Sequence, residues 1–382
     1  MTFRLPGSET PPARRDFLRQ SLWLGLSTIG VFMWPAKARG WYEQAPPGSG
    51  GPTINVRDKG AKGDGTHDDT VAIQAAIDSL PASGGTVVIP SGNYMIDATH
   101  AINLRSNMLL QMATDAQLTA MPNSLPRSHV IKIWQASNVR ITGGRIVGER
   151  KGHLGVGGEW GYGLNIEASN HVSVSHMHIS DCWGDGIWVG ALGPDRNAVP
   201  ATQVVIDQVI STNNRRQGMS IGPVNGVLVT NSTFSNTNGT KPEAGIDIEP
   251  QGQGPARDIT IIGCTISGNH GTGIEMHDNV TGVAVKNCTI EGNAGYGLMT
   301  VGTAQVTVAN NAISSNGLTG VTIGGTTNGA QVVGNRFTGN SSRYFHRVVS
   351  MFSTKSSDQQ NHELRIDDTT RGVTASGNTF SS

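Results

Sequence analysis

A short phrase recurs through the middle of the chain: a glycine followed by an apolar, a variable and a second apolar residue. Its copies begin at Gly163, Gly186, Gly218, Gly245, Gly273, Gly297 and Gly320. In an extended strand successive side chains point to opposite faces, so the apolar residues of each copy face one side and the variable residues face the other. The phrase therefore predicts a series of short strands that each bury one face.

A second phrase, which ends in an apolar residue, gives the spacing of the series. Its apolar residues are Ile146, Ile179, Ile210, Phe234, Ile266, Ile290, Ile313, Phe337 and Phe380. The steps between them are 33, 31, 24, 32, 24, 23, 24 and 43 residues. A basal coil of 23 or 24 residues with loop insertions accounts for every step, and such a period is typical of a solenoid. The longest step contains residues 341–371, for which we expect a long loop.

An asparagine stands three residues after several of these apolar positions. The residues are Asn213, Asn269, Asn293, Asn316 and Asn340. Stacked in consecutive coils, each amide can bond to the next coil and satisfy buried backbone groups. We expect a structural ladder of asparagines.

The stretch before the repeats has helical spacing. Residues 54–78 predict a strand, a turn rich in Gly and Asp, and an amphipathic helix. The apolar face of that helix would hold Val71, Ile73, Ala76, Ile77 and Leu80. Asp68 or Asp69 is the expected N-cap. Calcium binding by these two aspartates and Asp64 is the alternative interpretation.

This opening also resembles a known family. The run Asn-Val-x-Asp-x-Gly-Ala-x-Gly-Asp-Gly, followed by Asp-Asp-Thr-x-Ala-Ile-Gln-x-Ala-Ile, is similar to the N-terminal cap of the pectate-lyase-like proteins. The resemblance implies an all-β fold, a right-handed parallel β-helix with an N-terminal capping helix. It places the cap at residues 54–97 and a single domain at residues 54–382. Lyases, hydrolases, epimerases and binding proteins share this opening, so it implies carbohydrate as the ligand without choosing a reaction.

The first 38 residues resemble a twin-arginine export signal. Ala13-Arg-Arg-Asp-Phe-Leu-Arg19 precedes a mostly apolar run, Ser21 to Trp34, and then a small-x-small cleavage pattern, Ala36-Lys-Ala38. The apolar run is too short for a comfortable membrane span. We therefore expect a periplasmic or secreted protein, free of the membrane after cleavage, with a Gly- and Pro-rich linker at residues 39–53. The alternative is an amphipathic first helix of the fold.

Charge argues against nucleic acid as a partner. The chain has 28 basic and 28 acidic residues, of which five and two lie in the first 38 residues, leaving 23 basic against 26 acidic. A net charge of −3 without a basic stripe lacks the electrostatic footprint of a nucleic-acid-binding protein.

Three cysteines accompany the predicted export. Cys264 and Cys288 occupy equivalent places in neighbouring repeats, where strands about 4.8 Å apart bring them within disulfide reach. Two buried thiols are the preferred interpretation, and a disulfide is the alternative. Cys182 has no evident partner.

The outward positions of the glycine phrase form two columns. The first is Asn165, Trp188, Ser220, Asp247, Glu275, Met299 and Thr322, and the second is Glu167, Gly190, Gly222, Glu249, His277, Val301 and Gly324. Asp247, Glu249, Glu275 and His277 stand out against the mostly uncharged remainder, so they are the predicted catalytic residues, expected together on a wet lateral surface.

The spacing of these carboxylates fits acid–base chemistry at a glycosidic bond. Adjacent strands place Asp247 and Glu275 about 5 Å apart, and strand rise places Glu249 about 6.6 Å from Asp247. These separations bracket those of retaining and inverting glycosidases. Packing like charges so closely should raise one pKa and create a general acid. Solvated surface residues or a calcium site are the alternatives.

The predicted substrate-binding residues surround this cluster. They are Asp185, Trp188, Arg215, Arg216, Glu167 and Trp160. Trp188 offers an apolar plate for a sugar ring, and the two arginines can neutralise a uronate or the acidic cluster. Gly190 and Gly222 would leave an open floor. The insertion from Val147 to Tyr162, which contains Trp160, would form a wall.

The sequence thus predicts an exported β-helix enzyme that cleaves a polysaccharide by hydrolysis or β-elimination. The motifs of polygalacturonases are missing, and Ile248-Glu-Pro250 is only a partial echo of the Asp-Pro-His phrase of alginate epimerases. A uronate C5-epimerase and a non-catalytic glycan-binding or surface-structural protein are the alternatives. No cofactor is required, although Ca²⁺ is possible, and we expect a monomer or a homotrimer.

Overall fold

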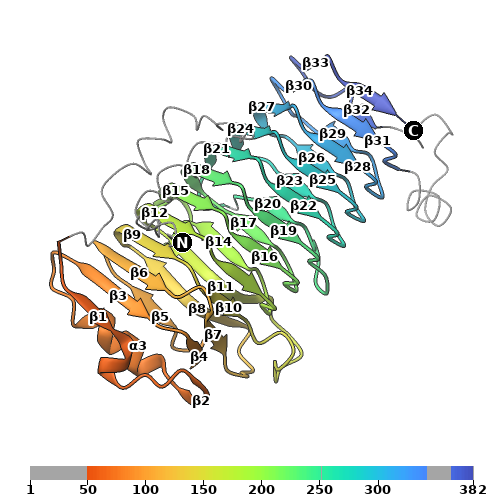
Figure 1. The fold of residues 1–382 in the computed structure, drawn as a ribbon. Helices are drawn as coiled ribbons and strands as arrows, with labels where there is room; N and C mark the ends of the chain where they lie inside the picture. The colour runs from red at the N-terminus through yellow and green to blue at the C-terminus, as the bar shows by residue number, and fades with distance from the viewer. Residues whose placement is uncertain (1–49, 251, 342–362, 382) are drawn as a thin grey trace, which may run out of the picture.

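The computed structural model describes residues 50–250, 252–341 and 363–381 as a rod of stacked coils (Figure 1). Each full coil contributes one strand to each of three parallel sheets, of 12, 12 and 10 strands. The predicted all-β, right-handed parallel β-helix is confirmed. The residues predicted as signal peptide, and all but the end of the predicted linker, lie outside the described part of the chain.

The strands of each sheet follow one another along the rod. Sheet A contains β1 (Thr53–Asn55), β3 (Gly85–Ile89), β6 (Met108–Met112), β9 (Ser137–Thr142), β12 (Asn170–Ser175), β15 (Ala201–Asp207), β18 (Val224–Thr230), β21 (Ala256–Ile262), β24 (Val280–Lys286), β27 (Ala304–Ala309), β30 (Gln331–Val333) and β33 (Thr374–Ser376). Sheet B contains β2 (Asp64–Asp68), β4 (Gly92–Ile96), β7 (Ala116–Ala120), β10 (Arg145–Val147), β13 (His178–Ser180), β16 (Ile210–Thr212), β19 (Thr233–Ser235), β22 (Thr265–Ser267), β25 (Thr289–Glu291), β28 (Ala312–Ser314), β31 (Arg336–Thr338) and β34 (Thr379–Ser381). Sheet C contains β5 (Ile102–Leu104), β8 (Arg127–Trp134), β11 (Trp160–Glu167), β14 (Ile187–Gly190), β17 (Met219–Ile221), β20 (Ile246–Ile248), β23 (Ile274–Met276), β26 (Leu298–Val301), β29 (Val321–Gly324) and β32 (Leu364–Ile366).

Two 3₁₀ turns, η1 (Val56–Lys59) and η2 (Asp195–Asn197), and one α-helix, α3 (Thr70–Asp78), complete the described elements. Helix α3 covers the first coils and buries Ile73, Ala76 and Ile77. Val71, predicted on the buried face, is 78% exposed. Asp69 takes the predicted N-cap position, but its side chain does not cap the helix, because its carboxylate accepts hydrogen bonds from Lys62 N and Gly63 N of the preceding turn. The carboxylate of Asp68, the other candidate, accepts from Thr70 N at 2.9 Å. Among the described residues, no helix has the length and apolar character needed to span a membrane.

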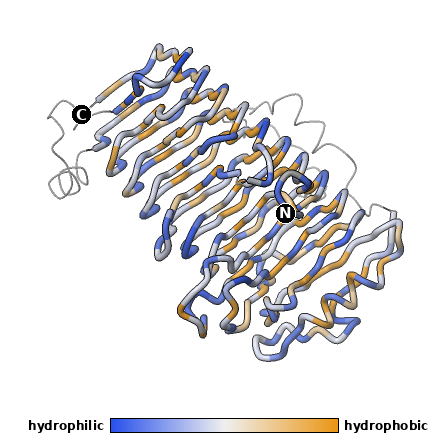
Figure 2. Tube along the Cα trace, turned by 180° about the vertical axis from the view of Figure 1, so that it is seen from behind, coloured by the Kyte–Doolittle hydropathy of each residue, from blue (hydrophilic) through white to orange (hydrophobic). Residues whose placement is uncertain are grey.

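The interior is a stack of aliphatic side chains. Hydrophobic positions recur from coil to coil along the chain trace (Figure 2). Most residues of the second phrase belong to it, but Ile210 is 45% exposed. In β16 the buried place opposite Ile179 and Phe234 is taken by Ser211. The Ser211 hydroxyl donates to Gly218 O at 2.7 Å, which satisfies it inside the core. Phe380 is 56% exposed because it lies on β34, the last strand of its sheet.

The asparagine ladder is present with one change of member. Asn269, Asn293 and Asn316 each donate to the amide oxygen of the next asparagine, and Asn340, the last of the four, donates to the carboxylate of Glu363. Asn213 is wrongly placed in the ladder by the sequence pattern, since the buried amide at that level belongs to Asn214. A second ladder of Asn311, Asn335 and Asn378 was not predicted.

The three cysteines, Cys182, Cys264 and Cys288, are free and buried. This confirms the prediction of buried thiols over the alternative of a disulfide. Of the loop predicted at residues 341–371, residues 342–362 lie outside the described part of the chain. Strand β32 begins at Leu364, so the predicted loop extends too far at its C-terminal end.

Candidate functional site

The first predicted column lies along sheet C in the expected register. Asn165 pairs with Trp188, Trp188 with Ser220, Ser220 with Asp247, and Asp247 with Glu275. The column continues through Met299 and Thr322. Asp247, at the centre of the column, was expected to be exposed to solvent. That expectation is wrong, because Asp247 is only 1% exposed. Side chains from the neighbouring coils bond to Asp247 and enclose it.

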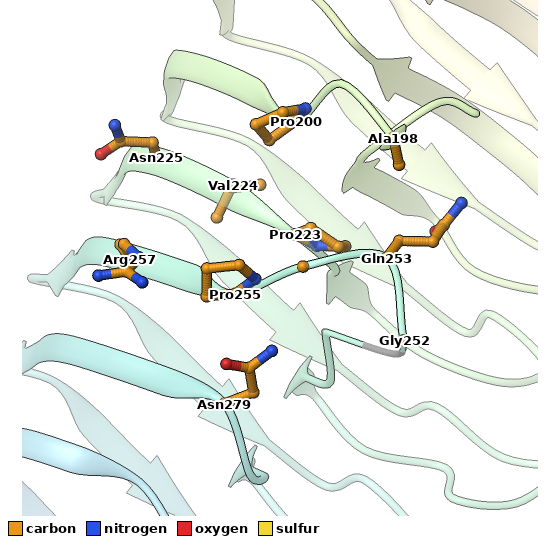
Figure 3. A pocket seen from close by; sticks show the side chains of 11 residues that line it. Ala198, Pro200, Pro223, Val224, Asn225, Gly252, Gln253, Pro255, Arg257 and Asn279 are labelled. Carbon is orange, nitrogen blue, oxygen red and sulfur yellow. The ribbon is translucent and has the colours of Figure 1, made fainter. Parts of the chain in front are cut away.

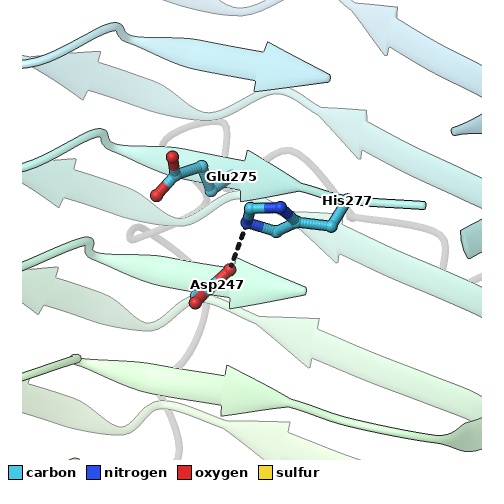
Figure 4. Close-up of side chains that lie close together, drawn as sticks. All are labelled: Asp247, Glu275 and His277. Carbon is cyan, nitrogen blue, oxygen red and sulfur yellow. Dashed lines mark ion pairs between the residues drawn. The ribbon is translucent and has the colours of Figure 1, made fainter. Parts of the chain in front are cut away.

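Asp247, Glu275 and His277 come together at the centre of the column (Figure 4). Asp247 belongs to β20 and Glu275 to β23, and His277 directly follows β23. One nitrogen or oxygen atom from each residue lies within 4.8 Å of the others. The His277 Nε2 and Asp247 Oδ1 atoms form an ion pair at 3.2 Å. We call these three residues the central trio.

Gln217 fixes the carboxylate of Asp247 from the neighbouring coil. Its Nε2 donates to Asp247 Oδ2 at 2.6 Å, and its Oε1 accepts from Ala244 N at 3.0 Å. Gln217 is fully buried, so both ends of its amide are committed. Asp247 is therefore held as a hydrogen-bond acceptor in one orientation.

The central trio shifts two pKa values upward. Burial, with the nearby Asp247 adding to it, raises the pKa of Glu275 to about 7. The contact with the Asp247 carboxylate raises the pKa of His277 to about 9, against the opposing effect of burial. Near neutral pH, a large fraction of Glu275 carries a proton while His277 is an imidazolium.

The His277 pair makes stability depend on pH. Because the folded-state pKa of His277 lies above its usual 6.5, its contribution to stability is complete below pH 6.5 and is lost as the pH rises through about 9. The side chain is 32% exposed, so solvent screens part of this effect. Between pH 6 and pH 10 we expect the free energy of unfolding to fall by roughly 1–2 kcal/mol more in the wild type than in His277→Gln. Urea unfolding between pH 6 and pH 10 measures the difference. His270→Gln, a change at an exposed histidine, is the control, and parallel curves for wild type and His277→Gln would contradict the assignment.

A second buried charge cluster adjoins the central trio. Asp185 is fully buried and accepts from Ser220 Oγ at 2.8 Å, while Arg216 Nη1 lies 3.2 Å from its Oδ2. Burial raises the pKa of Asp185 to about 6, although Arg216 opposes the change. Arg216 also faces Glu159, at 3.7 Å from Nε to Oε2. Arg216 thus connects the interior carboxylate to the surface loops.

A pocket of about 530 Å³ opens beside these clusters. Arg127, Glu159, Trp160, Tyr162, Glu167, Trp188, Ala191, Leu192, Gly193, Arg216, Glu249 and Gln253 line it. Glu249, the fourth predicted catalytic residue, is half-buried and faces this pocket. Burial raises the pKa of Glu167. The pocket therefore combines aromatic faces with charges of both signs, as a site for a charged sugar would.

Of the six predicted binding residues, four line this pocket and two do not. Asp185 is fully buried and absent from the lining, so its predicted contact with substrate is wrong. Trp160, Glu167, Trp188 and Arg216 line the pocket. Arg215 does not, because its guanidinium stacks 3.8 Å from the centre of the Trp183 ring and donates to Gly158 O at 3.0 Å. Its observed contacts hold the insertion loop in place, so the expected orientation toward the groove is wrong.

The predicted glycine floor is covered by an indole. A Cβ atom at Gly190 would lie 2.9 Å from Trp188 Nε1, and one at Gly222 would lie 3.1 Å from the same ring system. The two glycines make room for Trp188 rather than leaving the second column open. The indole itself forms the floor.

A second pocket, of about 520 Å³, lies next to the first (Figure 3). Ala198, Pro200, Pro223, Val224, Asn225, Gly252, Gln253, Gly254, Pro255, Arg257 and Asn279 line it. Gln253 borders both pockets and donates to Gly193 O at 2.7 Å, which joins two loops. Arg257 is the charged residue in this lining, so the groups suited to acid–base chemistry lie in the first pocket and the central trio.

Several residues of the site escaped the sequence analysis. Lys132 stands beside Asn165 and extends the first column onto β8. Its Nζ lies 4.2 Å from the centre of the Trp134 ring. The alternation of Ile131, Lys132 and Ile133 could have revealed this strand, although it lacks the initial glycine. Gln217 gave no such signal, because it precedes the repeated phrase by one residue.

Comparison with known proteins places this β-helix in a family. The chain belongs to the pectate lyase-like family described as rhamnogalacturonase A/epimerase, whose model matches residues 53–298. A model for right-handed β-helix regions also matches residues 242–380.

Two curated relatives show the extent of the similarity. YclG of Bacillus subtilis, an uncharacterized protein, is 31% identical in an alignment of 243 residues that covers 58% of this chain and 42% of YclG. Mannuronan C5-epimerase AlgE6 of Azotobacter vinelandii is 36% identical in an alignment of 153 residues that covers 37% of this chain and 15% of the epimerase. The chain spans less than half the length of either relative.

Solved structures support the fold. The A-module of AlgE6 from Azotobacter vinelandii has a TM-score of 0.65 at 18% identity, covering 86% of this chain and 99% of the module. ORF18 of Geobacillus virus E2 also has a TM-score of 0.65 at 18% identity, covering 86% of this chain and 61% of that protein.

Proposed function

We propose that the chain is an exported carbohydrate-active enzyme that cleaves a polysaccharide along the outer face of sheet C. The observation that carries the proposal is the pair of carboxyl groups on adjacent strands, Asp247 and Glu275, with oxygens within 4.8 Å. Retaining glycosidases use carboxyl groups about 5–5.5 Å apart. Hydrolysis with retention is therefore the reaction that we propose for this pair, with the sugar reaching Asp247 from the side of the partly buried Glu275 and His277.

Each member of the central trio has a distinct role in this proposal. Glu275, whose pKa is raised to about 7, is the general acid that protonates the leaving oxygen. Asp247 is the nucleophile, oriented by the hydrogen bond from Gln217 and by its ion pair with His277. In the second step Glu275 removes a proton from water, and the water releases the sugar from Asp247.

The neighbouring pocket would hold the sugar next to the cleaved bond. Trp160 and Trp188 offer apolar faces for sugar rings, and Arg216 faces the same space. Glu249 lines the pocket, where it can accept a hydrogen bond from a sugar hydroxyl, and its charge also acts on Glu275 and His277. These positions are consistent with an extended polymer that crosses the strands of sheet C.

Conversion of a uronate is the second candidate reaction. The matched relatives include mannuronan C5-epimerases and alginate lyase 7 of Azotobacter vinelandii. Arg127, Lys132 and Arg216 lie in or near the groove and could neutralise a sugar carboxylate. In this reaction a carboxylate of the trio would remove the C5 proton instead of attacking the anomeric carbon.

Product analysis of the full chain against acidic and neutral glycans tests these reactions. New reducing ends without ultraviolet absorbance indicate hydrolysis. New absorbance from an unsaturated uronate indicates elimination, and altered uronate stereochemistry in an intact polymer indicates epimerisation. Binding to a glycan without any product would favour the non-catalytic alternative and overturn the proposal.

Export by the twin-arginine route completes the proposal. Changing Arg14 and Arg15 together to lysine should leave an uncleaved precursor in the cytoplasm, because the paired arginines are the part of the signal that resembles this pathway. Fractionation and immunoblotting measure the precursor. Arg4→Lys is the control, and unchanged export of the double variant would refute the route.

The assembly state also remains a prediction. The structural neighbours include the Dettilon tailspike protein, which matches with a TM-score of 0.64 at 16% identity and shows likeness of fold alone. Light scattering of the purified chain distinguishes the expected monomer or homotrimer.

A further inference from the structure

Two atoms of the central trio are spaced like neighbouring ligands of a metal ion, and the third residue lies close to both. In tetrahedral zinc sites the metal lies about 2.0–2.2 Å from nitrogen and oxygen ligands, which places neighbouring ligands about 3.3 Å apart. His277 Nε2 and Asp247 Oδ1 are 3.2 Å apart. A carboxyl oxygen of Glu275 lies within 4.8 Å of the other two ligand atoms.

A buried oxygen faces the centre of this arrangement. The Asp247 side chain is 2% exposed, and among the described residues its Oδ1 accepts no hydrogen bond. The His277 Nε2 atom lies 3.2 Å from this oxygen and forms an ion pair with it. The cation that faces this buried oxygen is the His277 imidazolium, and a metal ion bound to both groups would take the place of its proton.

The surrounding residues support a rigid site with an open side. Gln217 holds the other oxygen of Asp247 at 2.6 Å, as outer-shell partners orient metal ligands. Asp247 and Glu275 lie on paired strands, which fixes their separation. Glu275 and His277 are only partly buried, so one side of the trio remains accessible to an ion and to water.

The donor set favours a transition metal over calcium. Calcium takes six to eight oxygen ligands, whereas an imidazole nitrogen suits zinc and its neighbours. Two carboxylates, one imidazole and an open position form the pattern of three protein ligands found in accessible zinc sites.

We propose that Asp247, Glu275 and His277 bind one Zn²⁺ ion. Binding replaces the proton on His277 with the metal and takes up lone pairs of both carboxyl groups. The ion then prevents Glu275 from donating a proton and Asp247 from attacking a sugar. The metal site is independent of the proposed function, but its role as an inhibitory switch rests on that function.

Calorimetry of the full chain, stripped of metal with chelator, tests the site directly. Titration with Zn²⁺ should give one site per chain. Loss of a residue that orients a metal ligand weakens metal binding by about 10–100-fold. We expect Gln217→Leu to weaken Zn²⁺ binding within this range, and His277→Ala, which removes a ligand, to weaken it further. Glu249→Gln, which removes a nearby carboxylate outside the trio, should keep the stoichiometry and lose far less affinity.

Several results would overturn the proposal of a Zn²⁺ site. They are the absence of a zinc isotherm, equal affinity in His277→Ala, or binding of Ca²⁺ as tight as that of Zn²⁺. Circular dichroism of every variant identifies loss of fold, and if His277→Ala fails to fold, His277→Gln replaces it.

Turnover measurements separate the site from its effect. With a substrate found by glycan screening, saturating Zn²⁺ should reduce turnover to background and chelator should restore it. A zinc isotherm without any turnover would sustain the site and refute the proposed function. Turnover unaffected by bound zinc would refute the switch, and normal turnover without a zinc isotherm would refute the site alone.

Discussion

Replacing Asp247 by asparagine is expected to lower turnover by about 10³-fold or more while the polymer remains bound. The substitution keeps the shape of the side chain but removes the charge that attacks the sugar and pairs with His277. Initial rates and retention on immobilised polysaccharide measure the two effects. The loss should appear in kcat rather than in KM.

Asp78→Asn is the matched control for that experiment. Asp78 lies on the exposed side of helix α3, far along the rod from the central trio (Figure 1). The control should keep wild-type turnover. An Asp247→Asn protein that is folded and fully active would remove Asp247 from the chemistry.

The second large effect is the loss of turnover at alkaline pH. Since Glu275 must be protonated to act as the acid and its pKa is about 7, kcat/KM should fall about tenfold for each pH unit above 7. Measuring kcat/KM from pH 5 to pH 9 in the presence of chelator records this fall, which we call the alkaline limb of the pH profile. Glu275→Gln should lose most of the activity and the limb with it.

Glu249→Gln tests whether the limb belongs to Glu275. Glu249 contributes a smaller share to the raised pKa of Glu275 than burial or Asp247 does. Removing its charge should shift the limb slightly toward lower pH and leave its shape. A profile that is flat from pH 6 to pH 9 would exclude Glu275 as the acid.

The fold was predictable because the sequence repeats its own pattern. Alternation after each glycine placed Asp247 beside Glu275, and the strand pairing agrees residue by residue. The same reasoning failed at Ile210, where a polar residue takes the buried place. Ser211 can do so because its hydroxyl reaches Gly218 O, a contact between residues seven positions apart that alternation does not contain.

The candidate site was only partly predictable, because covering side chains come from outside the repeated phrase. Periodicity gave the direction of Asp247 but not its burial, which depends on residues such as Gln217. Arg215 and Arg216 are neighbours in sequence, yet one holds a loop and the other faces the pocket. A strand pattern assigns faces, whereas loop contacts decide which of two adjacent side chains enters a groove.

The central claim, that Asp247, Glu275 and His277 form one coupled acid–base cluster, is tested most directly by NMR titration of Glu275 and His277 in chelator. The structure predicts a pKa of about 7 for Glu275 and about 9 for His277, with both changed by Asp247→Asn. Values near the usual 4.5 and 6.5, unchanged by that substitution, would contradict it.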